Sequence, residues 1–305
     1  MTGTFLGLPG CDDLSRLDAD IALLGIPGAT PYPGAGAFCA GAPAAIRAAM
    51  APRAATIGHH DFDFDAPLLP AGARVVDCGD LAFDPADFPG NRGRIRSAIS
   101  TILDRGAVPV VLGGDDSVQI PLFEAFAGRG NFTLLQIDAH IDWRDDVMGE
   151  RHGLSSTMRR AAEQPHVTRL IQVGQRGTGS ARPVDVADAL AAGAILVPAR
   201  TLHCDGIAGV LDLIPAGANV LIAFDCDALD PAIMPAVNAP SPGGLTYWQV
   251  IDLLHGVAAK ARIANFNLVE FMASRDVGGA GALIAGRILA NVVGLVARQG
   301  KVVAT

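Results

Sequence analysis

The sequence has few cysteines, few aromatic residues and no excess of basic residues. Its five cysteines are odd in number and scattered, and no CxxC pair occurs. This pattern predicts no disulfide framework and fits a reducing compartment. The 31 acidic residues outnumber the 23 basic ones, which gives a formal net charge of -8. A general nucleic-acid binder needs a basic face to neutralise phosphates, so the composition argues against that class and suits a protein that attracts cations.

The sequence also lacks the features of export and of a membrane span. The segment from Met1 to Cys11 contains neither a basic stretch nor a long apolar run, so no signal peptide is predicted. No apolar run reaches the roughly 18 residues of a transmembrane helix, because Asp, Arg or Gly interrupts each one. These absences predict a cytoplasmic protein that contacts no membrane.

What the sequence does contain is a regular alternation of two kinds of segment. Eight short runs are rich in Val, Ile and Leu without polar alternation, as in strands buried on both faces of a parallel sheet. They are Asp20–Ile26, Ala73–Cys78, Val108–Leu112, Phe132–Ile137, Arg169–Val173, Ala194–Val197, Asn219–Phe224 and Ile263–Val269. The helix-like segments are Asn91–Arg105, Ser117–Phe126, Gly153–Glu163, Val184–Ala191, Tyr247–Ala259 and Ala280–Arg298.

This order predicts a single α/β domain over residues 1–305. We expect a three-layer αβα sandwich around a central, mostly parallel sheet of about eight strands. Half of the residues are hydrophobic, enough for a sizeable core. The Pro- and Gly-rich stretch Pro27–Pro43 predicts a rigid, irregular surface loop that serves as a lid or a subunit contact.

Acidic residues follow four of the predicted strands. They are Asp115 and Asp116, then Asp138 and Asp142 with His140 between them, then Asp225 and Asp227, and finally Glu270. The carboxyl ends of parallel strands share one edge of a sheet, where open α/β folds bind ligands. Two like charges about 4 Å apart repel by several kcal/mol at an effective dielectric near 20, and buried carboxylates resist ionisation. A polyvalent cation removes both penalties, so the cluster predicts metal and is rich enough for two ions.

The spacing of these residues supports the metal prediction. Asp138, His140 and Asp142 alternate along the chain, so an extended segment would point them to one side. One imidazole among carboxylates favours Mn²⁺, with Ni²⁺ and Zn²⁺ less favoured. For any single motif the alternative is an ordinary helix cap, and Asp115 or Asp116 before Ser117 is the plainest candidate.

Taken together, the motifs resemble those of the arginase/agmatinase family of ureohydrolases. The matching segments are Gly-Gly-Asp-Asp-Ser at 113–117, Asp-Ala-His-Ile-Asp at 138–142, Phe-Asp-Cys-Asp-Ala-Leu-Asp-Pro at 224–231, Pro-Gly-Gly-Leu-Thr at 242–246, and Glu270. The Gln-Arg-Gly run at 175–177 is similar to a further family segment. The resemblance extends from about Asp20 to Arg298 and implies an arginase-like fold and an agmatinase-like enzyme.

The resemblance also implies the ligands of two divalent ions. Asp138 and Asp225 would bridge them. His140 and Asp227 would complete one ion, and Asp116 and Asp142 the other. The bound ions would lower the pKa of a shared water towards neutrality.

Three residues receive catalytic roles by the same resemblance. Asp142 would hold the attacking water and take its proton, and Glu270 would receive the substrate guanidinium. His152 would relay a proton to the leaving amine, so that the products are urea and an amine. Family members are commonly trimers or hexamers, which implies a homo-oligomer here.

The sequence departs from the family at positions that leave the substrate open. Asp116 replaces a ligand histidine, and Met272-Ala273 and Pro235-Ala236 replace the usual pairs. The segment Tyr32–Cys39 also differs. The favoured substrate is agmatine or a related guanidino compound. Arginine is less favoured.

The charged residues after Asp142 allow different substrate tails. Asp145, Asp146 and Glu150 would suit the distal ammonium of agmatine. Arg144 or Arg151 would instead suit a guanidino acid such as guanidinobutyrate. All five would also fit a solvated loop.

The sequence leaves two other functional interpretations open. The missing histidine would suit a non-catalytic subunit of a mixed oligomer. The second alternative is a single-zinc deacetylase on a related fold. A mononuclear catalytic zinc site needs only about three protein ligands, and the acids here are more numerous, which argues against it.

Overall fold

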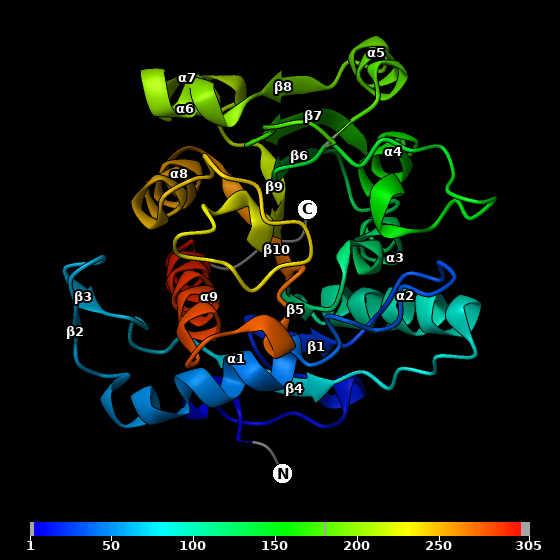
Figure 1. Ribbon diagram of the computed structural model, residues 1–305. Helices are drawn as coiled ribbons and strands as arrows, with labels where there is room; N and C mark the ends of the chain where they lie inside the picture. Colours follow the sequence, from blue (N-terminus) through cyan, green and yellow to red (C-terminus); the bar gives the residue numbers. More distant parts are fainter. Residues whose placement is uncertain (1–2, 180, 300–305) are drawn as a thin grey trace.

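The computed structural model describes residues 3–179 and 181–299, and an eight-stranded sheet forms its centre (Figure 1). In sheet order the strands are β4 (Val75–Asp80), β1 (Ile21–Ile26), β5 (Val108–Gly113), β10 (Arg262–Val269), β9 (Asn219–Asp225), β6 (Phe132–Ile137), β7 (Val167–Val173) and β8 (Ile195–Val197). Every neighbouring pair is parallel. The predicted parallel sheet is therefore confirmed, and all eight predicted segments overlap one of its strands.

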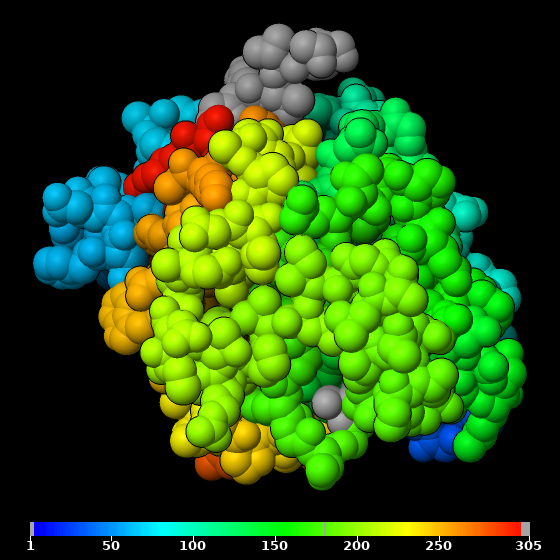
Figure 2. All heavy atoms as spheres, turned by 90° about the horizontal axis from the view of Figure 1, so that it is seen from above, coloured from blue at the N-terminus to red at the C-terminus, as the bar shows by residue number. Residues whose placement is uncertain are grey.

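Helices cover both faces of this sheet (Figure 1). One face is packed by α1 (Ala42–Met50), α6 (Ala199–Asp205), α7 (Ala208–Leu213), α8 (Tyr247–Lys260) and α9 (Ala280–Arg298). The other face is packed by α2 (Phe88–Asp104), α3 (Gln119–Glu124), α4 (Thr157–Ala162) and α5 (Pro183–Ala191). This is the predicted three-layer αβα sandwich. Figure 2 looks onto the end of the molecule where α5, α6, α7 and β8 lie.

The absence of polar alternation in the strands follows from this layering. Side chains of a strand point alternately to its two faces. In β5, Val110 and Leu112 enter the core under α9, whereas Val111 enters the core under α2 and α3. Strands β1, β5 and β6, none of which is an edge strand, are buried along their whole length. Apolar residues are consequently needed at successive positions.

The last helix, α9, is long and apolar enough to span a membrane by length and composition alone. However, 72% of its apolar window is buried inside the protein. Its side chains pack in the same core as those of α1 and α8. It is accommodated as a core helix of the sandwich.

Several elements were not predicted. Helix α1 starts inside the stretch that was expected to be a loop, because Pro43 occupies the first turn of the helix, where proline is well tolerated. The short α6 and α7 were also missed, as was a protruding hairpin formed by β2 (His60–Asp61) and β3 (Ala66–Pro67) (Figures 1 and 2).

The stretch Pro27–Pro43 differs from the expected surface loop in a second way. It is irregular up to α1, as predicted, but Thr30 and Cys39 within it are buried. The backbone N–H of Thr30 donates to the carboxylate of Asp115 at 2.5 Å. The segment is therefore packed beside the acidic strand ends, which are described next.

Candidate metal centre and substrate cavity

The predicted acids come from four adjacent strands of the sheet. Strands β5, β10, β9 and β6 are neighbours in that order. Each continues directly into part of the acidic set, which comprises Asp115, Asp116, Asp138, Asp142, Asp225, Asp227 and Glu270. Since the strands are parallel, their carboxyl ends lie at one edge. The topology thus explains why segments far apart in sequence supply one site.

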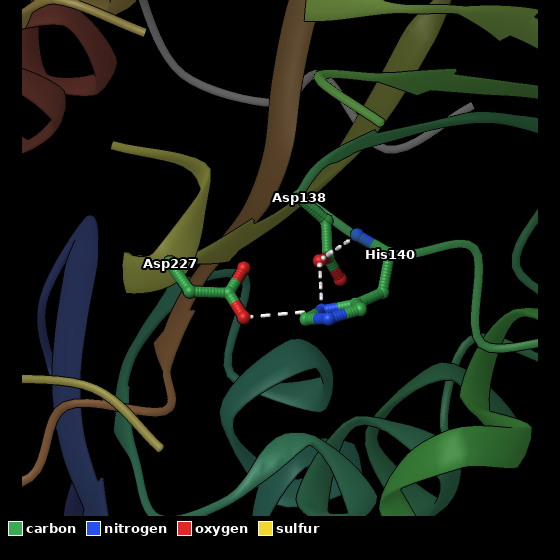
Figure 3. A group of neighbouring side chains, drawn as sticks. All are labelled: Asp138, His140 and Asp227. Atoms are coloured by element: carbon green, nitrogen blue, oxygen red, sulfur yellow. Dashed lines mark hydrogen bonds and ion pairs between the residues drawn. The ribbon is translucent and has the colours of Figure 1, made fainter. Parts of the chain in front are cut away.

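Two groups of side chains in the described chain are arranged as cation ligands. In the first, ligand atoms of Asp138, His140 and Asp227 all lie within 4.8 Å of one another. Figure 3 shows the imidazole between the two carboxylates, with Nδ1 at 3.0 Å from Asp227 and 3.3 Å from Asp138. In the second, Asp116, Asp138 and Asp225 meet the same criterion. Asp138 belongs to both groups, as expected of a bridging ligand, whereas Asp225 belongs only to the second.

The carboxylates of this cluster are buried close together, so their ionised forms need positive charge nearby. Burial and the neighbouring acids raise the pKa of Asp116 and of Asp225 well above the usual range. Burial opposes the charged form of His140, but its hydrogen bonds to Asp138 and Asp227 raise its pKa to about 11. The carboxylates repel one another, and the one imidazole holds a proton between two of them. Divalent cations would relieve the same repulsion.

Asp116 provides the clearest test of whether the residues fit a metal. It is 2% exposed, and its Oδ2 has no hydrogen-bond partner within the described residues. A buried carboxylate oxygen without a partner is costly unless a ligand satisfies it. The helix cap is supplied by Asp115, which accepts a hydrogen bond from Ser117 N at 3.1 Å. Asp116 is therefore not needed as the cap, and its side chain fits a cation.

Two of the predicted site residues have a left-handed backbone conformation. Asp142 has a φ of 48° and Glu270 a φ of 63°, a region that residues other than glycine rarely adopt. The carboxylate of Glu270 is buried and accepts a hydrogen bond from Asp116 N at 2.9 Å. Such strain is typical of functional sites, where the surrounding structure maintains it.

A cavity of about 190 Å³ opens next to these acids. Its lining includes Asp116, His140, Asp142, Asp225, Asp227 and Glu270. The remaining lining residues include Trp143, Arg144, Leu154, Ser155, Asp185 and Asn238. The cavity thus has space for a small molecule directly beside both groups of ligands.

The structure does not bring His152 to this cavity. Its ring Nδ1 lies 3.3 Å from the carboxylate of Glu150, and its side chain is 37% exposed. It lines a separate small cavity with Gly28 and Pro31. The proton-shuttle role of His152 stays a prediction, and it requires the loop that carries the residue to move.

Most of the charged residues proposed to bind the substrate tail also lie outside this cavity. Asp145 is paired with Arg160 at 2.9 Å and with Arg151 at 3.2 Å. Neither Asp146 nor Glu150 is among the described residues that line the cavity. Of the five candidates, Arg144 alone lines it.

A buried chain of amides positions the loop that carries Asp138 and Asp142. Gln136, on β6, donates to Asp138 at 2.6 Å and to Asp142 at 2.8 Å. Gln172 donates to Gln136 at 2.5 Å, and Trp143 Nε1 donates to Gln172 at 2.7 Å. Sequence reasoning missed this chain, although polar Gln136 inside an apolar strand is a signal for it.

Replacing Gln136 by methionine is expected to weaken metal binding about 10- to 100-fold, because groups that orient ligands tune affinity by this amount. Titration calorimetry with Mn²⁺ measures the effect. Gln175→Met is the matched control, since the Gln175 amide is also buried but has no hydrogen-bond partner among the described residues. Equal affinities for the two variants would contradict the positioning role.

Comparisons with known proteins agree with this geometry. The model of the Arginase family matches residues 19–294. An agmatinase of Pyrococcus horikoshii is 28% identical over 92% of this chain and 93% of its own length. An N(1)-aminopropylagmatine ureohydrolase of Thermus thermophilus is 34% identical over 67% of this chain and 70% of its own.

Among solved structures, proclavaminate amidino hydrolase from Streptomyces clavuligerus is similar, with a TM-score of 0.83, 26% identity and 98% coverage of both chains. The chain therefore belongs to the arginase family of hydrolases.

Proposed function

We propose that the protein is a ureohydrolase that binds two divalent cations and hydrolyses a guanidino substrate, agmatine or a related compound, to urea and an amine. The observation that carries the proposal is the pair of buried ligand groups that share Asp138. Both groups contribute residues to the cavity that Glu270 also lines. A family relationship supports the reaction class, and the curated relatives include an agmatinase and a guanidinopropionase.

The donor set suits Mn²⁺ better than Ni²⁺ or Zn²⁺. His140 is the only imidazole among carboxylates in the two groups, and oxygen-rich sites favour hard cations. Asp138, His140 and Asp227 would hold one ion, and Asp116, Asp138 and Asp225 the other, with Asp142 beside them. When bound, the ions supply positive charge that makes a water more acidic and stabilises charge developing on the substrate.

The remaining steps fall to the chain's own side chains. Glu270 would receive the guanidinium in a charge-assisted pair and fix the plane of its central carbon. Asp142 would hold the attacking water and take its proton. Because resonance makes guanidinium a poor electrophile, this orientation contributes much of the rate.

A screen for urea release tests the proposal. The protein, loaded separately with Mn²⁺, Ni²⁺ and Zn²⁺, is incubated with agmatine, arginine and guanidino acids. Release of urea from at least one compound with a metal-dependent rate is the expected result. No urea from any compound, together with metal-dependent release of acetate from acetylated amines, would point instead to a deacetylase.

His152→Ala tests the proton relay. The variant is expected to lose about 100-fold or more in turnover, as is typical of general acid-base groups, while its metal content stays unchanged. Added imidazole would restore part of the rate. Wild-type turnover would show that His152, which faces Glu150 in the structure, only belongs to the loop.

We also propose a cytoplasmic location and a homo-oligomer, as trimer or hexamer. The cysteine pattern and the family relationship support them. Light scattering of the purified protein measures the second property directly.

A further inference from the structure

The cavity contains a cation that the proposed chemistry does not use. Arg144 lines the cavity, and its side chain is 33% exposed. Its backbone N–H donates to Ser155 O at 2.8 Å, which fixes the residue on the cavity wall. Its one ion pair with a described residue joins Nε to Asp185 at 3.3 Å.

Asp185 does not neutralise this part of the cavity. It accepts hydrogen bonds from Arg182 Nε at 2.9 Å, Arg182 Nη2 at 2.6 Å and Arg182 N at 3.0 Å. Burial opposes its charge, but these bonds and Arg144 keep the pKa of Asp185 below its usual value. One ionised carboxylate is therefore shared by two guanidinium groups, and its closer contacts are with Arg182.

The lining of the cavity consequently carries charges of both signs. Six carboxylates line the cavity, and five of them belong to the acidic set that follows the strands, namely Asp116, Asp142, Asp225, Asp227 and Glu270. The sixth is Asp185. Among the described lining residues, Asp185 is the one carboxylate within ion-pair distance of Arg144, and it also pairs with Arg182. Trp143 and Leu154 are among the other residues that line the cavity. A distal ammonium would meet the like charge of Arg144, whereas a carboxylate would meet a guanidinium whose ion pair with Asp185 involves only Nε.

We infer that Arg144 binds the carboxylate of an ω-guanidino acid, with Asp185 and Arg182 holding Arg144 in place. This inference rests on the proposed function and narrows its substrate class. Glu270 would receive the guanidinium end of the substrate and Arg144 the acid end. The guanidinium of arginine presents a planar fork that matches a carboxylate, and such charge-assisted pairs are strong and geometrically specific.

A matched pair of substrates tests the inference. 4-Guanidinobutanoate and agmatine have similar lengths and opposite charges at the distal end. The wild-type protein is expected to prefer 4-guanidinobutanoate in kcat/KM for urea release. Arg144→Gln should lower kcat/KM for the acid about 30-fold or more, the usual result of truncating one partner of a charged pair, and should leave agmatine within about 3-fold.

Two further variants and a control complete the test. Arg144→Lys keeps the charge and should retain part of the preference, whereas Arg144→Glu should reverse it. Arg151→Gln is the control, because Arg151 pairs with Asp145 and Glu163 away from the cavity; it should leave the substrate ratio unchanged. Metal content and circular dichroism should match the wild type in all four variants.

The outcomes separate the inference from the proposed function. Urea release with agmatine preferred, or an unchanged ratio in Arg144→Gln, would overturn the role of Arg144 and leave the ureohydrolase proposal standing. No urea from any guanidino compound with any metal would overturn both.

Discussion

Asp138→Asn is expected to abolish urea release and to remove bound metal. Asp138 is fully buried and is the one residue shared by the two candidate ligand groups. An amide has the shape of the carboxylate but not its negative charge, so neither ion would be neutralised. Metal ions stabilise the transition states of such reactions by several kcal/mol. Losing this stabilisation corresponds to a decrease of about a thousandfold or more in rate. Asp225→Asn, in the second group, should have a similar effect.

Asp230→Asn is the matched control for these variants. Asp230 belongs to the same acidic run as Asp225 and Asp227, but its carboxylate accepts hydrogen bonds from the backbone N–H groups of Ala232 and Gly243. Asparagine keeps an acceptor oxygen for Ala232 but loses the second oxygen, which accepts from Gly243 and Gly244. This weakens a loop contact but removes no candidate metal ligand, so metal content and turnover should stay near the wild-type values. Elemental analysis after gel filtration gives the metal content. Full occupancy with unimpaired turnover in Asp138→Asn would refute the assignment of the centre.

Asp116→Ala is expected to abolish binding of the ion assigned to Asp116, Asp138 and Asp225. Turnover should fall about 100-fold or more, because two-metal sites need both ions to stabilise the reacting oxygens. The stability of the metal-free protein separates this role from a structural one. Burial and the charge of Asp138 raise the pKa of Asp116, so removing its carboxyl should not lower the unfolding midpoint without metal. With Mn²⁺ present, the midpoint should fall below that of the wild type, since less metal binds to the folded state.

Asp116→His extends this prediction to metal choice. An imidazole in place of the carboxylate makes the site less oxygen-rich, so retention of Ni²⁺ and Zn²⁺ should improve relative to Mn²⁺. If Asp116 only stabilised the helix start, Asp116→Ala would cost about 1 kcal/mol of stability and keep both metals. Asp115 already provides that cap, which favours the ligand role.

The sheet could be predicted from the sequence because burial on both faces leaves a strong pattern. The run Phe132–Ile137 is bounded as predicted, since its apolar side chains are divided between the two cores, with Phe132 and Leu134 in one and Leu135 and Ile137 in the other. Helix α1 was obscured by Pro43, which reads as a loop residue until its place in the first helical turn is known. The acids were predictable for a related reason. They follow strands directly, and parallel strands bring their carboxyl ends together.

The outer part of the cavity could not be predicted in this way. Asp185 lies in the first turn of α5, and Asn238 lies on a loop far along the chain. Neither position carries a periodic signal that would place it in the same cavity as Arg144. His152 shows the converse. It follows the metal motif closely in sequence, but chain proximity does not fix the direction of a loop, and its ring faces Glu150.

Anomalous X-ray scattering from crystals loaded with Mn²⁺ tests the central claim most directly. The account predicts two peaks per chain, one between Asp138, His140 and Asp227 and one between Asp116, Asp138 and Asp225. A single peak, or no peak at either group of ligands, would contradict a binuclear centre.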